Sequence, residues 1–213
     1  MTDRSRTLFL SLIFLLSLSC ASGCTSVRTS DTHNTTAAIQ SYNAWIAQQQ
    51  DFDRNVGGSI TQIGDHITTY NREIARDQTD YALLRSDIAK DRGVLDQWGS
   101  GLDNLTAATD GFEKITAKLT YGNTSAAKIK ATLGLITQYM RIYTTDMGNA
   151  RQHLIDYENN EEKYVGTDNP DYWNDQYRQD ALQAKDQASA ALSDADLALG
   201  NVTTQAKNLE NLQ

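Results

Sequence analysis

From Ile39 onward, apolar side chains recur at alternating intervals of three and four residues. This spacing corresponds to a period of about 3.5 residues, which is typical of helices packed side by side in a coiled coil or a bundle. A β-strand has a period of two and does not generate it. The first run reaches Leu119 through Tyr42, Ile46, Gln49, Asp53, Val56, Ile60, Ile63, Ile67, Tyr70, Ile74, Asp77, Tyr81, Leu84, Ile88, Asp91, Leu95, Trp98, Leu102, Leu105, Thr109, Phe112 and Thr116.

This run predicts a first helix over residues 37–121, about 130 Å long if unbroken. Gly57-Gly58 and the segment 99–101 (Gly-Ser-Gly) are possible breaks, because glycine costs about 1 kcal/mol inside a helix. The phase of the apolar positions is unchanged across both sites, which favours one long, bent helix.

Two further helices are predicted over residues 125–165 and 171–212. Gly122 lies in the turn before the first, and the only proline, Pro170, lies in the turn between them. The apolar positions of the last helix are mostly alanine, so we expect its backbone to pack closely against a neighbour. The predicted fold is therefore all-α: an elongated antiparallel bundle or coiled coil of three main helices, the first possibly kinked or broken, within a single domain at 37–213.

The segment 37–80 has no partner in this three-helix arrangement. Its apolar stripe must be buried, because an exposed stripe of this size would not stay solvated. It can fold back at Gly57-Gly58 or pair with another chain, and the sequence leaves both possibilities open.

Residues 1–23 have the organisation of a secretory signal peptide. Arg4 and Arg6 precede an apolar stretch over 8–18, followed by small residues. The stretch would form a helix of about 16 Å, too short to cross a hydrocarbon core of about 30 Å. Residues 24–36 are small or polar and show no periodicity, which predicts a flexible tether.

Both cysteines lie at the end of this signal. Ala21-Ser22-Gly23-Cys24 resembles the lipobox of prokaryotic lipoproteins, and the surrounding Ser-Gly-Cys-Thr-Ser is similar to surface lipoproteins of archaea such as methanogens. The resemblance implies a lipid on Cys24, with Cys20 as the alternative, and a protein held outside the cell membrane. Ordinary cleavage after Gly23 followed by secretion is the other possibility.

The chain of 213 residues has a formal net charge of −8. An acidic surface of this kind repels nucleic acid and anionic lipid, so we expect neither as a partner.

Three aspartates, Asp53, Asp77 and Asp91, occupy core-facing positions of the first run. Buried carboxylates are costly unless they are paired. These residues are candidates for a polar cavity or a ligand site, or they fix the register of the helices. Arg54, Arg76 and Arg92 are their possible partners because each is adjacent in sequence.

A second candidate is the turn between the last two predicted helices, where aromatic side chains lie among acids. Its spacing fits no calcium-binding loop. It is either a solvated helix end capped by aromatic rings or a recognition surface, and the candidate surface comprises Tyr164, Asp168, Asp171, Tyr172, Trp173 and Tyr177.

No catalytic constellation is present in the sequence. His33, His66 and His153 have no metal-ligand spacing to other histidines, cysteines or glutamates, and we expect them to be solvated. We therefore expect no metal, no cofactor and no enzymatic activity. Four glycosylation sequons occur, and Asn34 in the tether and Asn123 in the turn are the best placed acceptors.

Two functional hypotheses follow. The first is a membrane-anchored extracytoplasmic protein with a structural, adhesive or assembly role, which contacts a protein partner or a second copy through its helix faces. The alternative is an extracytoplasmic helical bundle that binds a ligand, as a sensor or carrier module. A ligand-binding module predicts a cavity lined by the stripe aspartates and tyrosines, whereas an assembly protein predicts a dry, continuous seam.

Overall fold

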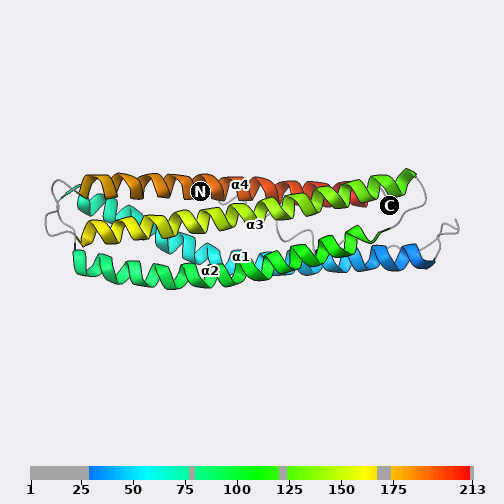
Figure 1. Cartoon of the computed structure of the whole chain (residues 1–213), viewed down its shortest axis with the longest axis horizontal. Coiled ribbons are helices and arrows are strands. Elements are labelled where there is room, and N and C mark those ends of the chain that lie inside the picture. Colours follow the sequence, from blue (N-terminus) through cyan, green and yellow to red (C-terminus); the bar gives the residue numbers. More distant parts are fainter. Residues whose placement is uncertain (1–28, 77–79, 120–123, 167–173, 212–213) are drawn as a thin grey trace.

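A computed structural model describes residues 29–76, 80–119, 124–166 and 174–211 (Figure 1). The protein is all-α. Its helices are α1 (Thr29–Ile74), α2 (Tyr81–Ala117), α3 (Thr124–Val165) and α4 (Asn174–Glu210). They lie alongside one another in an elongated bundle, which confirms the predicted fold class.

Successive helices run in opposite directions (Figure 1). Trp45 in the first half of α1 donates to Thr109 in the second half of α2, and Tyr70 near the end of α1 donates to Asp87 near the start of α2. Of the neighbouring pairs, α3 and α4 have the most extensive close backbone contact. Alanines on α4 allow this approach because they add almost no bulk between the two backbones. The buried ones are Ala181, Ala184, Ala188, Ala191, Ala195, Ala198 and Ala206.

The prediction of three main helices is wrong, because the predicted first helix is divided into α1 and α2. The division lies within residues 75–80. Asp80 is the N-cap of α2, and its Oδ1 accepts hydrogen bonds from the backbone N–H groups of Ala82 and Leu83, each at 3.0 Å. A capped start supplies acceptors for backbone donors that have no partner inside the helix, so a new helix is stable here.

Residues 57–58 and 99–101 are therefore not breaks, since both lie inside continuous helices. Gly57 and Gly58 face open space, and their cost of about 1 kcal/mol each is small beside the packing of the whole helix. Gly101 has a packing role instead. A Cβ at this position would lie 2.7 Å from Cδ2 of Phe52 on α1, so only glycine leaves room for that ring.

The apolar stripe of α1 is buried against other helices of the same chain. α1 folds back and packs against α2, at the turn after Ile74 rather than at Gly57-Gly58. Val56, Ile63 and Ile67 of its apolar stripe enter the common core, together with Trp45 and Phe52 beside the stripe.

α1 already begins at Thr29, inside the segment 24–36 for which the sequence predicted a flexible tether. Once the stripe from Ala38 onward is packed, extending the helix into flanking residues costs little, since only nucleation is unfavourable. Residues 24–28 lie outside the described part of the chain. The other predicted ends agree well: α3 closes where Gly166 donates its N–H to the carbonyl of Glu162 at 3.0 Å.

Large side chains from α1, α2 and α3 fill the centre of the bundle. Trp45 packs edge-on against Tyr143 with ring centroids 5.9 Å apart, and Phe52 packs edge-on against Trp98 at 6.3 Å. A smaller core of Tyr70, Leu84, Ile88 and Val165 lies at the end opposite the start of α1. We call this end the far end. No described helix is both long and apolar enough to cross a bilayer.

Candidate functional site

The recognition surface predicted around the α3–α4 turn lies only partly in the described residues. Tyr164 is half-buried against the far-end core, and Tyr177 has the Nζ of Lys163 5.6 Å from its ring centroid. Burial raises the pKa of Tyr164 to about 12, so it remains a neutral phenol. The other four predicted members, Asp168, Asp171, Tyr172 and Trp173, lie outside the described residues.

A cluster of polar side chains lies just inside this end of the bundle. We call it the far-end polar cluster, and it consists of His66, Tyr70, Asp87, Asp91 and Glu158. The predicted polar core residue Asp91 is at its centre and only 1% exposed. One carboxylate oxygen of Asp91 lies 2.8 Å from Nδ1 of His66, and the other accepts a hydrogen bond from Gln62 at 3.0 Å.

Asp87 lies one turn earlier on α2 and is also satisfied. It accepts hydrogen bonds from the Tyr70 hydroxyl at 2.5 Å and from the Lys90 ammonium at 2.8 Å, while Nε2 of His66 is 3.8 Å from its carboxylate. Burial acts to raise the pKa of Asp87, but the bonds from Lys90 and Tyr70 outweigh it and lower this pKa. Asp87 is therefore a stable anion beside Asp91, and His66 lies between the two carboxylates.

Glu158 on α3 has a different environment. It is 1% exposed, and its Oε2 has no hydrogen-bond partner among the described residues. Burial, together with the nearby negative charges of Asp91 and Glu161, raises the pKa of Glu158 to about 9. At neutral pH this side chain is a buried, uncharged carboxylic acid, because an isolated carboxylate is too costly to bury here.

Two arginines tie the neighbouring helices together around this cluster. Arg178 of α4 pairs with Glu161 of α3, and this pair is almost completely buried, with the side chains 12% and 0% exposed. Burial raises the pKa of Glu161 against the opposing effect of Arg178. Arg92 of α2 bridges to Glu162 at 2.6 Å on the outside of the bundle and holds the pKa of Glu162 low.

The second predicted polar core residue, Asp53, lies near the middle of the bundle. Its carboxylate accepts a hydrogen bond from the Tyr143 hydroxyl on α3 at 2.5 Å and one from Gln49 on its own helix. Burial raises the pKa of Asp53 to about 6, although both hydrogen bonds oppose this shift. Asp77, the third predicted member, is outside the described residues.

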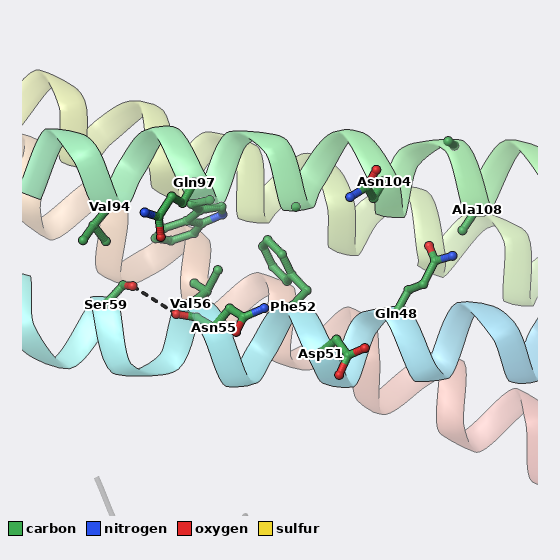
Figure 2. Close-up of a pocket in the computed structure, with 13 residues that line it drawn as sticks. Gln48, Asp51, Phe52, Asn55, Val56, Ser59, Val94, Gln97, Asn104 and Ala108 are labelled. Atoms are coloured by element: carbon green, nitrogen blue, oxygen red, sulfur yellow. Dashed lines mark hydrogen bonds between the residues drawn. The ribbon is translucent and has the colours of Figure 1, made fainter.

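The structure also contains a groove that the sequence did not predict, between α1 and α2 (Figure 2). Its volume is about 800 Å³. Carboxamide side chains from both helices line it, and Phe52 and Val56 point from α1 toward α2 between them. The carboxamides are Gln48, Asn55, Gln97 and Asn104.

Sequence reasoning missed His66 and Glu158. His66 was expected to be solvated, and Glu158 was not among the candidate residues, yet Glu158 is buried and His66 is partly buried against two carboxylates. One signal was available for His66, since it immediately precedes the stripe residue Ile67 and lies four residues before Tyr70 on the same face. Glu158 directly follows the buried Tyr157, which is a much weaker signal.

Cys20, Cys24 and Asn123 lie outside the described residues, as does the side chain of Asn34. Within the part of the chain that is described, no three histidine, cysteine, aspartate or glutamate side chains are arranged to hold a metal ion.

Comparison of the chain with protein-family models, with curated proteins and with solved structures finds no match in any of the three.

Proposed function

We propose that the protein is an extracytoplasmic lipoprotein with a structural or adhesive role, anchored through Cys24 and contacting a partner through its helix faces and far end. One observation carries the proposal. α1 begins at Thr29, only five residues after Cys24, and its 46 residues extend over roughly 70 Å. A lipid on Cys24 would hold the start of the bundle at the membrane and display the far end well away from it.

The burial of segment 37–80 also bears on this role. Since α1 covers its stripe within the same chain, the protein does not need a second copy to fold. An assembly role therefore rests on the outer surface, where Leu83, Leu135, Ile142 and Leu197 are exposed. Single exposed apolar residues are ordinary, so we expect contacts with a partner to be reversible.

Anchoring is tested with Cys24→Ser and Cys20→Ser in a prokaryotic host that processes lipoproteins. We expect the Cys24 variant to be lost from the membrane fraction and the Cys20 variant to stay there, with a lipid mass on the N-terminal peptide of the latter. Loss with Cys20→Ser alone would move the anchor to Cys20. Retention of both variants would refute lipid anchoring.

The contact role is tested by photo-crosslinking on intact cells. Lys163 and Lys130 are both exposed on α3, the first at the far end and the second near the start of the bundle. A photoreactive residue at position 163 should capture a neighbouring protein more strongly than one at position 130. Equal absence of products at both positions would refute a contact role for the far end.

A second candidate function, ligand binding, is supported by the α1–α2 groove. Grooves of this volume with a few polar groups above an apolar floor are typical of ligand sites. The groove differs from the cavity expected for such a module, because its lining includes neither Asp53 nor Asp91.

A further inference from the structure

The charged side chains are not spread evenly along the bundle. The start of α1 lies beside the end of α2, the start of α3 and the end of α4 (Figure 1), and we call this the near end. Its terminal eleven-residue stretches contain five lysines and four acids, in residues 29–39, 108–118, 124–134 and 200–210. The matching stretches at the far end contain five basic and ten acidic side chains, in residues 64–74, 80–90, 155–165 and 174–184. The formal charges of the two ends are therefore +1 and −5.

The positive charge of the near end faces solvent. We call its five lysines the near-end lysines: Lys114, Lys118, Lys128, Lys130 and Lys207. All five are exposed, and none forms an ion pair with an acid among the described residues. Two of the acids at this end, Asp110 and Glu113, are instead paired with Arg141. The near-end lysines are therefore available to a partner.

Helix dipoles account for only some of these lysines. Lys114 and Lys207 lie in the last turns of α2 and α4, where the negative end of a helix dipole stabilises a cation by itself. Lys128 and Lys130 follow the first turn of α3, which is the positive end of that helix and contains no acid. Within the chain these two lysines lack the counter-charge that a helix start ordinarily has, so a negatively charged surface outside it would balance them.

The near-end lysines also lie at one level along the bundle. Each is within six residues of the end of its helix, which corresponds to about 9 Å at 1.5 Å per residue. Charges are screened over about 10 Å at 0.1 M ionic strength. All five ammonium groups can therefore act together on a flat, charged surface that touches the near end.

We propose that the near end docks on a membrane surface of anionic lipid headgroups, with the near-end lysines as its contacts. The net charge of −8 argues against such a partner only for a molecule whose charge is evenly distributed. The acidic far end is repelled by the same surface, so the bundle stands with its far end away from the membrane.

This proposal rests on the proposed anchoring through Cys24, which holds the near end at the membrane. The five residues from Cys24 to Thr29 reach at most about 18 Å, so the near end cannot leave the surface by more than this. A single lipid chain holds a protein only marginally, and a basic patch is one of the second signals that make anchoring stable. The near-end lysines would supply that second signal.

The test is flotation of the full-length chain with two kinds of vesicle. One consists of phosphatidylcholine alone, and the other also contains anionic phosphatidylglycerol. An inserted lipid chain binds the protein to both kinds, whereas the near-end lysines favour the anionic kind. The measured quantity is the ratio of the two partition coefficients. A failure of anchoring lowers both coefficients, and a failure of docking lowers only their ratio, so the two proposals can fail separately.

At about 0.1 M salt we expect the ratio to be about ten or more, because each lysine at an anionic surface contributes about five-fold and the acids of this end oppose it. At about 1 M salt, where the screening length is about 3 Å, the preference should disappear. The double variant Lys118→Gln with Lys130→Gln should lose most of the preference. Its matched control, Lys163→Gln with Lys185→Gln, makes the same change in net charge away from the near end and should keep it.

These substitutions replace ammonium groups at the surface, so circular dichroism should show the same helix content in every variant. Equal partition of the unaltered chain into the two kinds of vesicle would overturn the proposal. An equal loss of preference in the two double variants would overturn it as well. Lysine-dependent binding of soluble polyglutamate without a preference for anionic vesicles would overturn it in favour of an acidic protein partner.

Discussion

Glu158→Gln is the most direct test of the far-end polar cluster. The carboxyl of Glu158 is 1% exposed, and its pKa is raised from 4.5 to about 9 by burial and by the charges of Asp91 and Glu161. Between these values the folded protein keeps the proton and the unfolded chain releases it. The stabilising contribution is therefore complete below about pH 4.5 and is lost progressively as the pH rises toward 9.

The magnitude follows from the linkage relation. Each pH unit inside this interval removes about 1.4 kcal/mol of folding free energy. Between about pH 5 and about pH 7.5 the unaltered protein should thus lose about 3 kcal/mol through Glu158 alone. Glutamine has nearly the shape of the protonated acid and does not titrate. Asp53, whose raised pKa acts in the same direction, is present in both proteins and cancels from the difference.

We therefore expect the stability of the Glu158→Gln variant relative to the unaltered protein to rise by about 3 kcal/mol between about pH 5 and about pH 7.5. Urea unfolding followed by circular dichroism measures the stability at both pH values, because urea, unlike guanidinium, does not screen charges. Glu162→Gln is the matched control. Glu162 is more than half exposed, and Arg92 lowers its pKa, so its difference from the unaltered protein should stay flat over this range. A flat difference for Glu158→Gln as well would refute the assignment of a buried, neutral acid.

Variants at Arg178 with Glu161, at Gly101 and at Gly57 test the packing of the helices. Arg178→Ala leaves the buried Glu161 without its partner and should cost about 3–5 kcal/mol in urea unfolding, whereas Arg178→Met with Glu161→Leu should recover most of it. A double variant as unstable as Arg178→Ala would contradict the prediction that the unpaired buried Glu161 causes the loss. Gly101→Ala places a methyl group against Phe52 and should destabilise the protein by about 1–3 kcal/mol. In Gly57→Ala the added methyl group faces open space, and the variant should be more stable than the unaltered protein by about 0.5–1 kcal/mol. Thermal midpoints that shift in the same direction for the two glycine variants would contradict this packing geometry.

The sequence predicted the fold class and the ends of α3 because these depend on local signals: a period of 3.5 residues, Gly122 before the helix, and Gly166 and the single proline after it. It did not predict the division between α1 and α2. Ile74 and Tyr81 are seven residues apart, so the apolar phase passes through the turn unchanged. The turn has neither glycine nor proline, and its one signal was Asp80 as an N-cap. Periodicity reports which face of a helix is buried, but it does not report whether the helix is continuous.

The same limit explains why the polar core was predicted in position but not in its contacts. Asp91 and Asp53 do lie toward the interior, as their places in the stripe require. Their neighbours Arg92 and Arg54 were the expected partners, yet consecutive residues on a helix point about 100° apart and do not face each other. Arg92 pairs with Glu162 and Arg54 with Asp51.

Partners for a core-facing aspartate come instead mainly from the helices that pack against it. His66 and Gln62 of α1 reach Asp91 on α2, and Tyr143 of α3 reaches Asp53 on α1. These pairs are 25, 29 and 90 residues apart in the chain. Only the fold-back of α1 after Ile74 brings the first two together. The chemistry of the far end is therefore a consequence of the division between α1 and α2, which periodicity did not reveal.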